Sequence, residues 1–138
     1  MKIYFAASIR GGRQDVGVYK QLIDYLKQDN QVLTEHIADI NLTADGQRQI
    51  SDETIRNRDV DWLKEADLVV AETSHPSLGV GYELATAEKL SKPVIILHNP
   101  EKAKLSAMIV GTKYFKDIYY YHDVNEAIMF LKSFVSPK

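Results

Sequence analysis

The sequence predicts an α/β fold: a doubly wound, flavodoxin- or Rossmann-like sheet of about five parallel strands flanked by helices. Three observations support this prediction. The stretches "DLVVAET" (67–73) and "PVIILH" (93–98) are continuous apolar runs, typical of strands covered on both faces. Segments with helical spacing separate the apolar runs, as parallel strands require. The length of 138 residues suits a single domain over 1–138 with a sizeable core.

The other elements follow from the same alternation along the chain. "KIYFAA" (2–7) is expected to form the first strand, and apolar residues at helical spacing predict a helix over 14–28. The remaining expected elements are strands at 31–37 and 117–122, and helices at 50–66, within 76–90 and at 124–134, with the polar residues 38–48 as the longest loop.

The composition excludes several classes of function. The chain has a formal net charge of −2 and scattered Lys and Arg, so it lacks the basic surface typical of nucleic-acid binding. It has no cysteine, and no two of its four histidines have ligand spacing, so we expect neither a metal nor another cofactor. No apolar stretch approaches the roughly 20 residues of a membrane span, and the first apolar run meets Arg10 too early for a signal peptide. We expect a cytoplasmic protein without membrane or nucleic-acid partners.

The predicted topology places one crevice at the carboxyl ends of the strands, where doubly wound sheets bind ligands. Three segments leave the strands there: "SIRGG" (8–12), "TEH" (34–36) and "TSHPSLGVG" (73–81). His36 ends the second predicted strand on this side and is placed to touch a base. We expect the other three histidines to be loop or strand-end residues without a catalytic task; they are His75, His98 and His122.

Two carboxylates are predicted to face inward beside this crevice. At about 100° per residue, Glu83 falls inside the apolar arc of its helix, and Asp59 falls near the middle of the apolar stripe of 50–66. Two such groups suit chemistry at an anomeric carbon, with one as nucleophile and the other handling a proton or orienting the first. The residues alone leave two alternatives open. Glu83 could lie at the edge of the face and extend to water, and Asp59 could be a structural residue bound to backbone N–H groups, Arg56 or Arg58.

Two glycine-containing loops before helices are candidate phosphate sites, because helix N-termini attract anions. The first loop offers Ser8 and Arg10, and the second offers Ser77 and Gly79. The chain contains neither a Walker loop nor a GxGxxG motif, so a single phosphate monoester fits better than a nucleoside triphosphate or a dinucleotide. The alternative is that these glycines only form turns.

Four blocks of the sequence resemble the 2′-deoxynucleoside 5′-phosphate N-hydrolases, which are relatives of the nucleoside 2-deoxyribosyltransferases. The blocks run in family order across nearly the whole chain, and the third is highly specific. They are "IYFAASIRGGR" (3–13), "VLTEHI" (32–37), "RDVDWLKEADLVVAETSHPSLGVGYEL" (58–84) and "LSAMIVG" (105–111).

The resemblance implies a role for each matching residue. Glu83 would be the nucleophile, Asp59 the general acid or the group that orients it, and Tyr4 a supporting residue. Ile9 would form an apolar wall near the 2′ position of the sugar, which disfavours a 2′-hydroxyl. The residues implied to hold the nucleotide and its 5′-phosphate are Ser8, Arg10, Gly11, Ser77, Gly79, Met108 and Ser106, with Ser106 supplied by the other subunit of a homodimer.

The resemblance also implies the reaction. It is hydrolysis of the N-glycosidic bond of 2′-deoxynucleoside 5′-monophosphates through a covalent glutamyl-sugar intermediate. Three alternatives remain: a nucleoside 2-deoxyribosyltransferase, a CMP-type ribonucleotide hydrolase, and a module that senses nucleotides without turnover. Phosphate ligands argue against the transferase, and two inward acids beside an anionic ligand argue against a pure binder.

Overall fold

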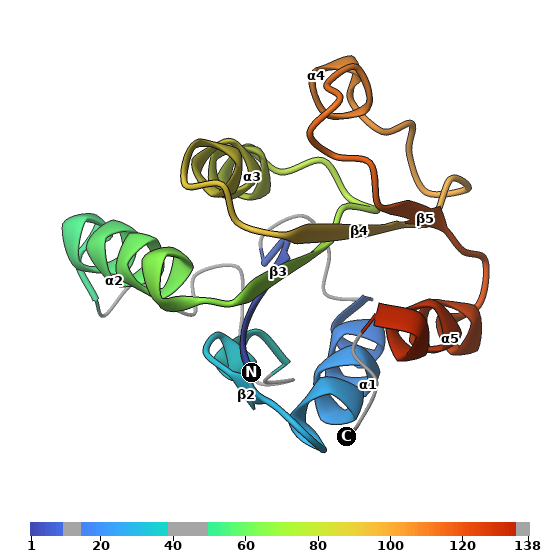
Figure 1. Cartoon of the computed structure of the whole chain (residues 1–138), viewed down its shortest axis with the longest axis horizontal. Helices are drawn as coiled ribbons and strands as arrows, with labels where there is room; N and C mark the ends of the chain where they lie inside the picture. Colours follow the sequence, from blue (N-terminus) through green and yellow to red (C-terminus); the bar gives the residue numbers. More distant parts are fainter. Residues whose placement is uncertain (10–14, 39–49, 135–138) are drawn as a thin grey trace.

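The computed structural model describes residues 1–9, 15–38 and 50–134 (Figure 1). It contains one five-stranded parallel sheet in the order β2-β1-β3-β4-β5, so the predicted fold class is confirmed. The strands are β1 (Lys2–Ala7), β2 (Gln31–Val32), β3 (Leu68–Glu72), β4 (Val94–His98) and β5 (Ile118–Tyr120). The helices are α1 (Val16–Lys27), the 3-10 helix η2 (Glu35–Ala38), α2 (Asp52–Glu65), α3 (Leu78–Lys89), α4 (Ala107–Val110) and α5 (Val124–Phe134).

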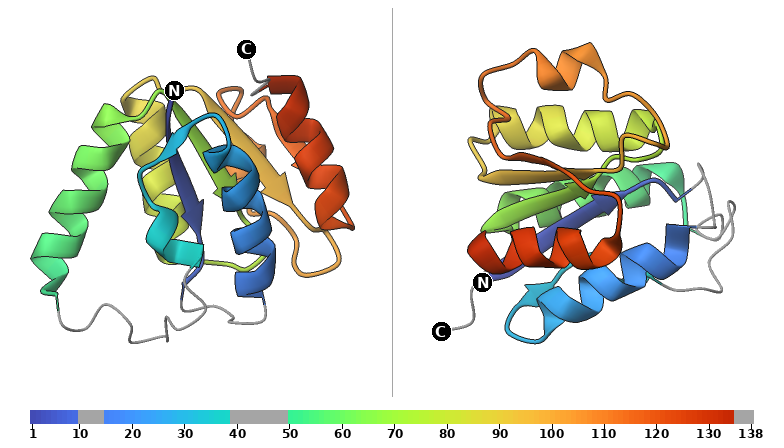
Figure 2. Two further views of the ribbon diagram at one scale, coloured as in Figure 1. Left: turned by 90° about the horizontal axis from the view of Figure 1, so that it is seen from below. Right: turned by 90° about the vertical axis from the view of Figure 1, so that its right-hand side faces the viewer.

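Helices cover both faces of the sheet. In the right-hand view of Figure 2, α3 and α4 lie above the sheet, and α1 and α5 lie below it. Alternate residues of β1 enter separate cores: Ile3 and Phe5 pack with α1 and α5, whereas Tyr4 and Ala6 pack with α2 and α3. All residues of β3 and β4 are buried, which explains their continuous apolar sequences.

The second strand is much shorter than predicted. Strand pairing ends at Val32, and the rest of the expected strand 31–37 forms a turn followed by η2. The side chain of Thr34 replaces further strand pairing, because its Oγ1 accepts from Phe5 N at 2.8 Å and donates to Phe5 O at 2.7 Å. His36 therefore lies in η2 and not at a strand end.

The other differences are at element ends. β5 is shorter than the predicted 117–122. α1 begins at Val16, and residue 14 of the predicted helix lies outside the described residues. Most of the predicted loop 38–48 lies outside the described residues. In the described part of the chain, no helix has both the length and the apolar character needed to cross a membrane.

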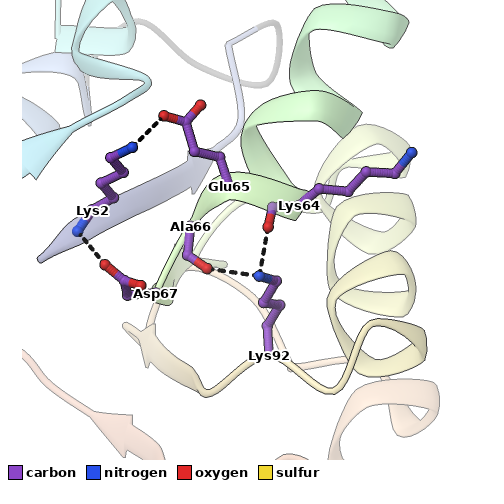
Figure 3. A network of polar contacts seen from close by, with 6 residues as sticks. All are labelled: Lys2, Lys64, Glu65, Ala66, Asp67 and Lys92. Atoms are coloured by element: carbon purple, nitrogen blue, oxygen red, sulfur yellow. Dashed lines mark hydrogen bonds and ion pairs between the residues drawn. The ribbon is translucent and has the colours of Figure 1, made fainter.

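A polar cluster, which we call the amino-edge network, joins several elements where the strands begin (Figure 3). Lys2 Nζ pairs with Glu65 Oε1 at 2.7 Å, and Lys2 N donates to Asp67 Oδ2 at 2.8 Å. Lys92 Nζ donates at 2.6 and 2.8 Å to two carbonyls at the end of α2, those of Lys64 and Ala66. These bonds satisfy carbonyls that a helix end leaves without intrahelical partners.

Candidate active site

The strand order creates a topological switch point between β1 and β3. The chain leaves β1 toward α1 on one face of the sheet and leaves β3 toward α3 on the other (Figure 1). A crevice at the carboxyl ends of such strands is the usual ligand site of this architecture. Tyr4, Asp59 and Glu83 belong to β1, α2 and α3 respectively, and interactions among their side chains link these three elements.

Glu83 points inward, as predicted, and contacts the first strand. The Oη of Tyr4, a residue only 1% exposed, donates a hydrogen bond to Glu83 Oε2. Burial of the carboxyl and the nearby charge of Asp59 raise the pKa of Glu83 to about 7, although the Tyr4 hydrogen bond opposes this rise. The alternative of a carboxylate extended to water is therefore wrong for Glu83.

Tyr4 serves as a fixed hydrogen-bond donor in this pair. Burial, together with the negative charges of Glu83 and Asp59, raises the pKa of Tyr4 far above its ordinary value. The phenol therefore keeps its proton at any physiological pH. Among the described residues, Tyr4 is the hydrogen-bond donor to Glu83, and it engages Oε2.

Asp59 is close enough to act electrostatically on both members of the pair, because its charge contributes to the raised pKa values of Tyr4 and Glu83. Its side chain is 28% exposed, and its Oδ1 accepts from Arg58 Nε at 3.1 Å. The Arg58 contact is the partner expected of a structural aspartate. The electrostatic coupling to Glu83 is the property expected of a catalytic one, so the geometry is compatible with both roles.

An aromatic and cationic wall continues the site from Asp59. The guanidinium carbon of Arg58 lies 4.8 Å from the ring centre of Trp62, and the rings of Trp62 and His36 are 5.8 Å apart. Burial, with the positive charge of Arg58, lowers the pKa of His36, so this ring is neutral at pH 7. Trp62 was not among the site residues predicted from the sequence. Its position three residues after Asp59, on the same helix face, was the available signal.

The predicted phosphate residues fall into two groups. Ser8 is buried and Ile9 packs beside one core, both just after β1, while Arg10 and Gly11 lie outside the described residues. Ser77 is the N-cap of α3, where its Oγ accepts from Val80 N at 3.2 Å. The adjacent Gly79 is exposed, and an added Cβ would meet only ordinary contacts, so the fold alone does not require glycine there.

Ser106 and Met108 lie on the other side of α3, away from Glu83. Ser106 is the N-cap of α4, as its sequence context predicts, and accepts from Met108 N at 3.2 Å. Both residues line a cavity of about 670 Å³ together with Ser77 and His75. Tyr4, Asp59 and Glu83 do not line this cavity, so one chain brings Ser106 to Ser77 but not to the carboxylates.

Some polar residues near the strand ends have their partners within the fold. His98 has both ring nitrogens engaged, with Nδ1 2.8 Å from Thr73 Oγ1 and Nε2 2.5 Å from Ala103 O. His122 is exposed and lies 3.6 Å from Glu101. Within residues 1–9, 15–38 and 50–134, no group of three His, Cys, Asp or Glu side chains is arranged to hold a metal ion.

The chain is similar to several known N-hydrolases. It is 48% identical to the 5-hydroxymethyl-dUMP N-hydrolase of Mus musculus over 111 residues, which cover 79% of this chain and 64% of that protein. Identity to the Danio rerio protein of the same name is 48%, covering 80% of this chain and 78% of the relative. A putative 2′-deoxynucleoside 5′-phosphate N-hydrolase 1 of Nematostella vectensis is 44% identical over 134 residues, or 93% of this chain and 91% of that one.

Solved structures share the fold at lower identity. The CMP N-glycosidase of Clostridium botulinum superposes with a TM-score of 0.72 at 22% identity, covering 97% of this chain and all of the other. A 2-deoxyribosyltransferase of Bacillus psychrosaccharolyticus superposes with a TM-score of 0.62 at 20% identity, covering 93% and 90%. The family model described as nucleoside 2-deoxyribosyltransferase matches residues 3–118. This protein therefore belongs to the nucleoside 2-deoxyribosyltransferase family.

Proposed function

We propose that this protein hydrolyses the N-glycosidic bond of 2′-deoxynucleoside 5′-monophosphates, releasing a free base and 2-deoxyribose 5-phosphate. The observation that carries the proposal is the inward Glu83 carboxylate, held by the Tyr4 hydroxyl and coupled to the charge of Asp59. Relatives at 44–48% identity bear the names of hydrolases for such nucleotides, which agrees with this assignment.

In the first step, the ionised Glu83 attacks C1′ of the sugar, and the bond between C1′ and the base nitrogen breaks. The electron pair of that bond leaves with the base, and Asp59 supplies a proton or orients the carboxylate. In the second step, water attacks C1′, gives a proton to Asp59 or to solvent, and displaces Glu83, which regenerates the carboxylate. Two displacements give net retention at the anomeric carbon.

Tyr4 contributes by holding one oxygen of Glu83 while the other reacts. A pKa of about 7 leaves a substantial ionised fraction of Glu83 at neutral pH. The wall formed by His36, Arg58 and Trp62 lies beside Asp59, where a leaving base would stack or donate hydrogen bonds. Ile9 provides the apolar contact for the 2′ position.

The 5′-phosphate is bound by Ser8, Arg10 and Ser77 together with backbone amides at the start of α3. The helix dipole and the free N–H groups of α3 favour an anion at this position. Gly79, in the first turn of α3, keeps that turn free of a side chain beside the nucleotide. Binding energy from the phosphate then holds C1′ against Glu83 and lowers the barrier as well as KM.

The enzyme is a homodimer in which Ser106 and Met108 of one subunit complete the nucleotide site of the other. Large apolar side chains beside the 670 Å³ cavity support this arrangement, since Leu78 is 97% exposed and Met108 is 84% exposed. A second copy would bury both side chains. Ser106→Ala and Glu83→Gln proteins, each weak alone, should recover activity when mixed and allowed to exchange subunits. No recovery after proven exchange would place Ser106 outside the partner's site.

The family and its structural neighbours favour two competing activities. One is transfer of the deoxyribosyl group to a second base, and the other is hydrolysis of CMP. A panel separates the three: 5-hydroxymethyl-dUMP, dGMP and CMP alone, and a deoxynucleoside with an acceptor base, each scored for free base and for a new nucleoside. We expect base release from a deoxynucleoside monophosphate at a kcat/KM on the order of a thousandfold above that of its nucleoside. Faster reaction of the unphosphorylated nucleoside with an acceptor base would instead identify a transferase.

A further inference from the structure

A buried contact joins the two segments that leave the sheet on either side of the switch point. His75 lies between β3 and α3, and Asp15 directly precedes α1. His75 Nε2 is 2.5 Å from Asp15 Oδ2, and the two side chains are 15% and 10% exposed. This is an ion-pair distance, although Nε2 has no acceptor in hydrogen-bond geometry among the described residues. This contact orients the imidazole ring.

The contact leaves the other ring nitrogen of His75 for a ligand. Nε2 is buried, so the exposed part of the side chain lies elsewhere on the ring. His75 lines the same cavity as Ser77 and Ser106, and it precedes the N-cap of α3 by two residues. An imidazolium ring donates from both nitrogens. In that form Nε2 faces the carboxylate of Asp15 at ion-pair distance, and Nδ1–H is available to an anion at the start of α3.

One buried carboxylate near His75 contacts the ring and the other has its own hydrogen-bond donors, so the ring can still contact an anion. Of the two nearby buried carboxylates, Asp15 faces His75, whereas Glu72 accepts from Ser74 N at 2.8 Å, Ser74 Oγ at 2.6 Å and the hydroxyl of Tyr121. Glu72 is therefore satisfied by its own donors. Lys104 and Glu88 also line the cavity and are exposed.

We propose that His75, oriented by Asp15, is a further contact of the 5′-phosphate and donates to it from Nδ1. The inference rests on the proposed function, because it places the phosphate of that substrate at the start of α3, beside Ser77. The resemblance that assigned the serines and Arg10 to the phosphate gave His75 no such role. Asp15 is a positioning residue here, since it acts on the ligand only through His75.

Two His75 variants and a matched control test this role. His75→Gln keeps an amide donor near Asp15 but removes the imidazole ring, and His75→Ala removes both. Both should lower kcat/KM for 5-hydroxymethyl-dUMP by roughly 10- to 100-fold, the range for a lost charge-assisted hydrogen bond. The value for 5-hydroxymethyl-2′-deoxyuridine, which has no phosphate, should stay within about twofold. The exposed His122→Gln should change neither value.

The second readout separates recognition from folding. In a Glu83→Gln background, calorimetric titration should show weaker binding of 5-hydroxymethyl-dUMP when His75 is also replaced, and unchanged binding of the nucleoside. Asp15→Asn should produce a smaller loss, again confined to the phosphorylated ligand. Equal losses for both ligands, or no loss for either, would overturn the inference.

The inference and the proposed function fail separately. If the wild type releases base from 5-hydroxymethyl-dUMP but the His75 variants match it, only the inference is wrong. If the wild type releases base from no nucleotide, the proposed function is wrong, and inorganic phosphate then serves as the probe. Tighter binding of inorganic phosphate by the wild type than by His75→Gln would still support the His75 contact, and equal binding would refute it.

Discussion

Charged side chains have different partners at the two ends of the sheet. In the amino-edge network, Lys2 and Lys92 meet carboxylates or carbonyls at 2.6–2.8 Å, so each cation has an acceptor (Figure 3). At the carboxyl end, the described partner of Glu83 is the neutral hydroxyl of Tyr4, and its nearest charge effect comes from another acid, Asp59. The first arrangement stabilises the fold. The second leaves a carboxylate with little compensation, which is typical of a reactive group.

Two glutamates at this end of the sheet, Glu72 and Glu83, also differ in how many hydrogen-bond donors they have. Glu72 and Glu83 both have raised pKa values, in each case mainly because of burial. Glu72 accepts three hydrogen bonds from Ser74 and Tyr121, whereas the described bond to Glu83 is the one from Tyr4. Burial alone therefore does not mark a catalytic acid. The number of donors separates the structural carboxylate from the candidate nucleophile.

The largest expected effect comes from Glu83→Gln. The amide keeps the shape of the side chain and the contact with Tyr4 but cannot form the ester with C1′, so base release should fall by several orders of magnitude. Nucleotide binding, measured by calorimetry, should persist. The amino-edge variant Lys92→Met is the control and should keep near wild-type turnover. Activity of Glu83→Gln within tenfold of wild type would contradict the covalent mechanism.

The next effect is that of Asp59→Asn. If Asp59 moves a proton or orients Glu83, turnover should fall on the order of 10²- to 10⁴-fold. The melting temperature should change little or rise, because the variant removes a partly buried charge near a second acid. A variant that mainly unfolds, with the residual folded fraction fully active, would assign Asp59 to the structural role with Arg58.

Local sequence patterns predict the fold correctly where the burial of a segment is itself what makes its sequence apolar. β3 and β4 are buried on both faces, so their apolar runs are visible without any tertiary information. The early end of β2 is different. It depends on Thr34 bonding to Phe5, which is 29 residues away, and nothing in residues 31–37 signals that contact.

The candidate site shows the same division. Helical spacing alone predicted that Glu83 and Asp59 face inward, because burial and periodicity are coupled within one helix. The hydrogen bond between Tyr4 and Glu83 spans 79 residues, and Tyr4 entered the prediction only through resemblance to a family. The contact between Asp15 and His75 joins residues 60 positions apart, and no sequence pattern links the two, so His75 was expected to have no catalytic task. Contacts between side chains that are far apart in the sequence can be identified only from the three-dimensional structure.

A smaller effect should appear in the pH dependence of stability. The pKa of Glu83 is about 7 in the folded state and near 4.5 in the unfolded chain, so the folded state binds more protons between these values. The stability that Glu83 contributes is therefore present below pH 4.5 and lost as the pH rises through 7, by up to about 3 kcal/mol. Relative to wild type, Glu83→Gln should be more stable at pH 8 than at pH 5 in urea titrations. The exposed Glu53→Gln is the control, and a Glu83 difference that did not vary with pH would contradict the buried, poised carboxylate.

The smallest expected effect is in the amino-edge network, where substitutions should change the stability of the protein but not its activity. Lys92→Met keeps the aliphatic length of the side chain but leaves the carbonyls of Lys64 and Ala66 without their donor. The Ala66 bond is partly buried, so its loss should cost about 1–2 kcal/mol of unfolding free energy. Lys2→Met removes only an ion pair whose side chains are 46% and 43% exposed, and solvent screening should make that loss smaller than the loss in Lys92→Met. Chemical denaturation measures both, and kcat/KM of the folded proteins should match wild type. A selective loss of turnover in Lys92→Met, at full folding, would show that the two ends of the sheet are functionally coupled and that the division drawn between them does not hold.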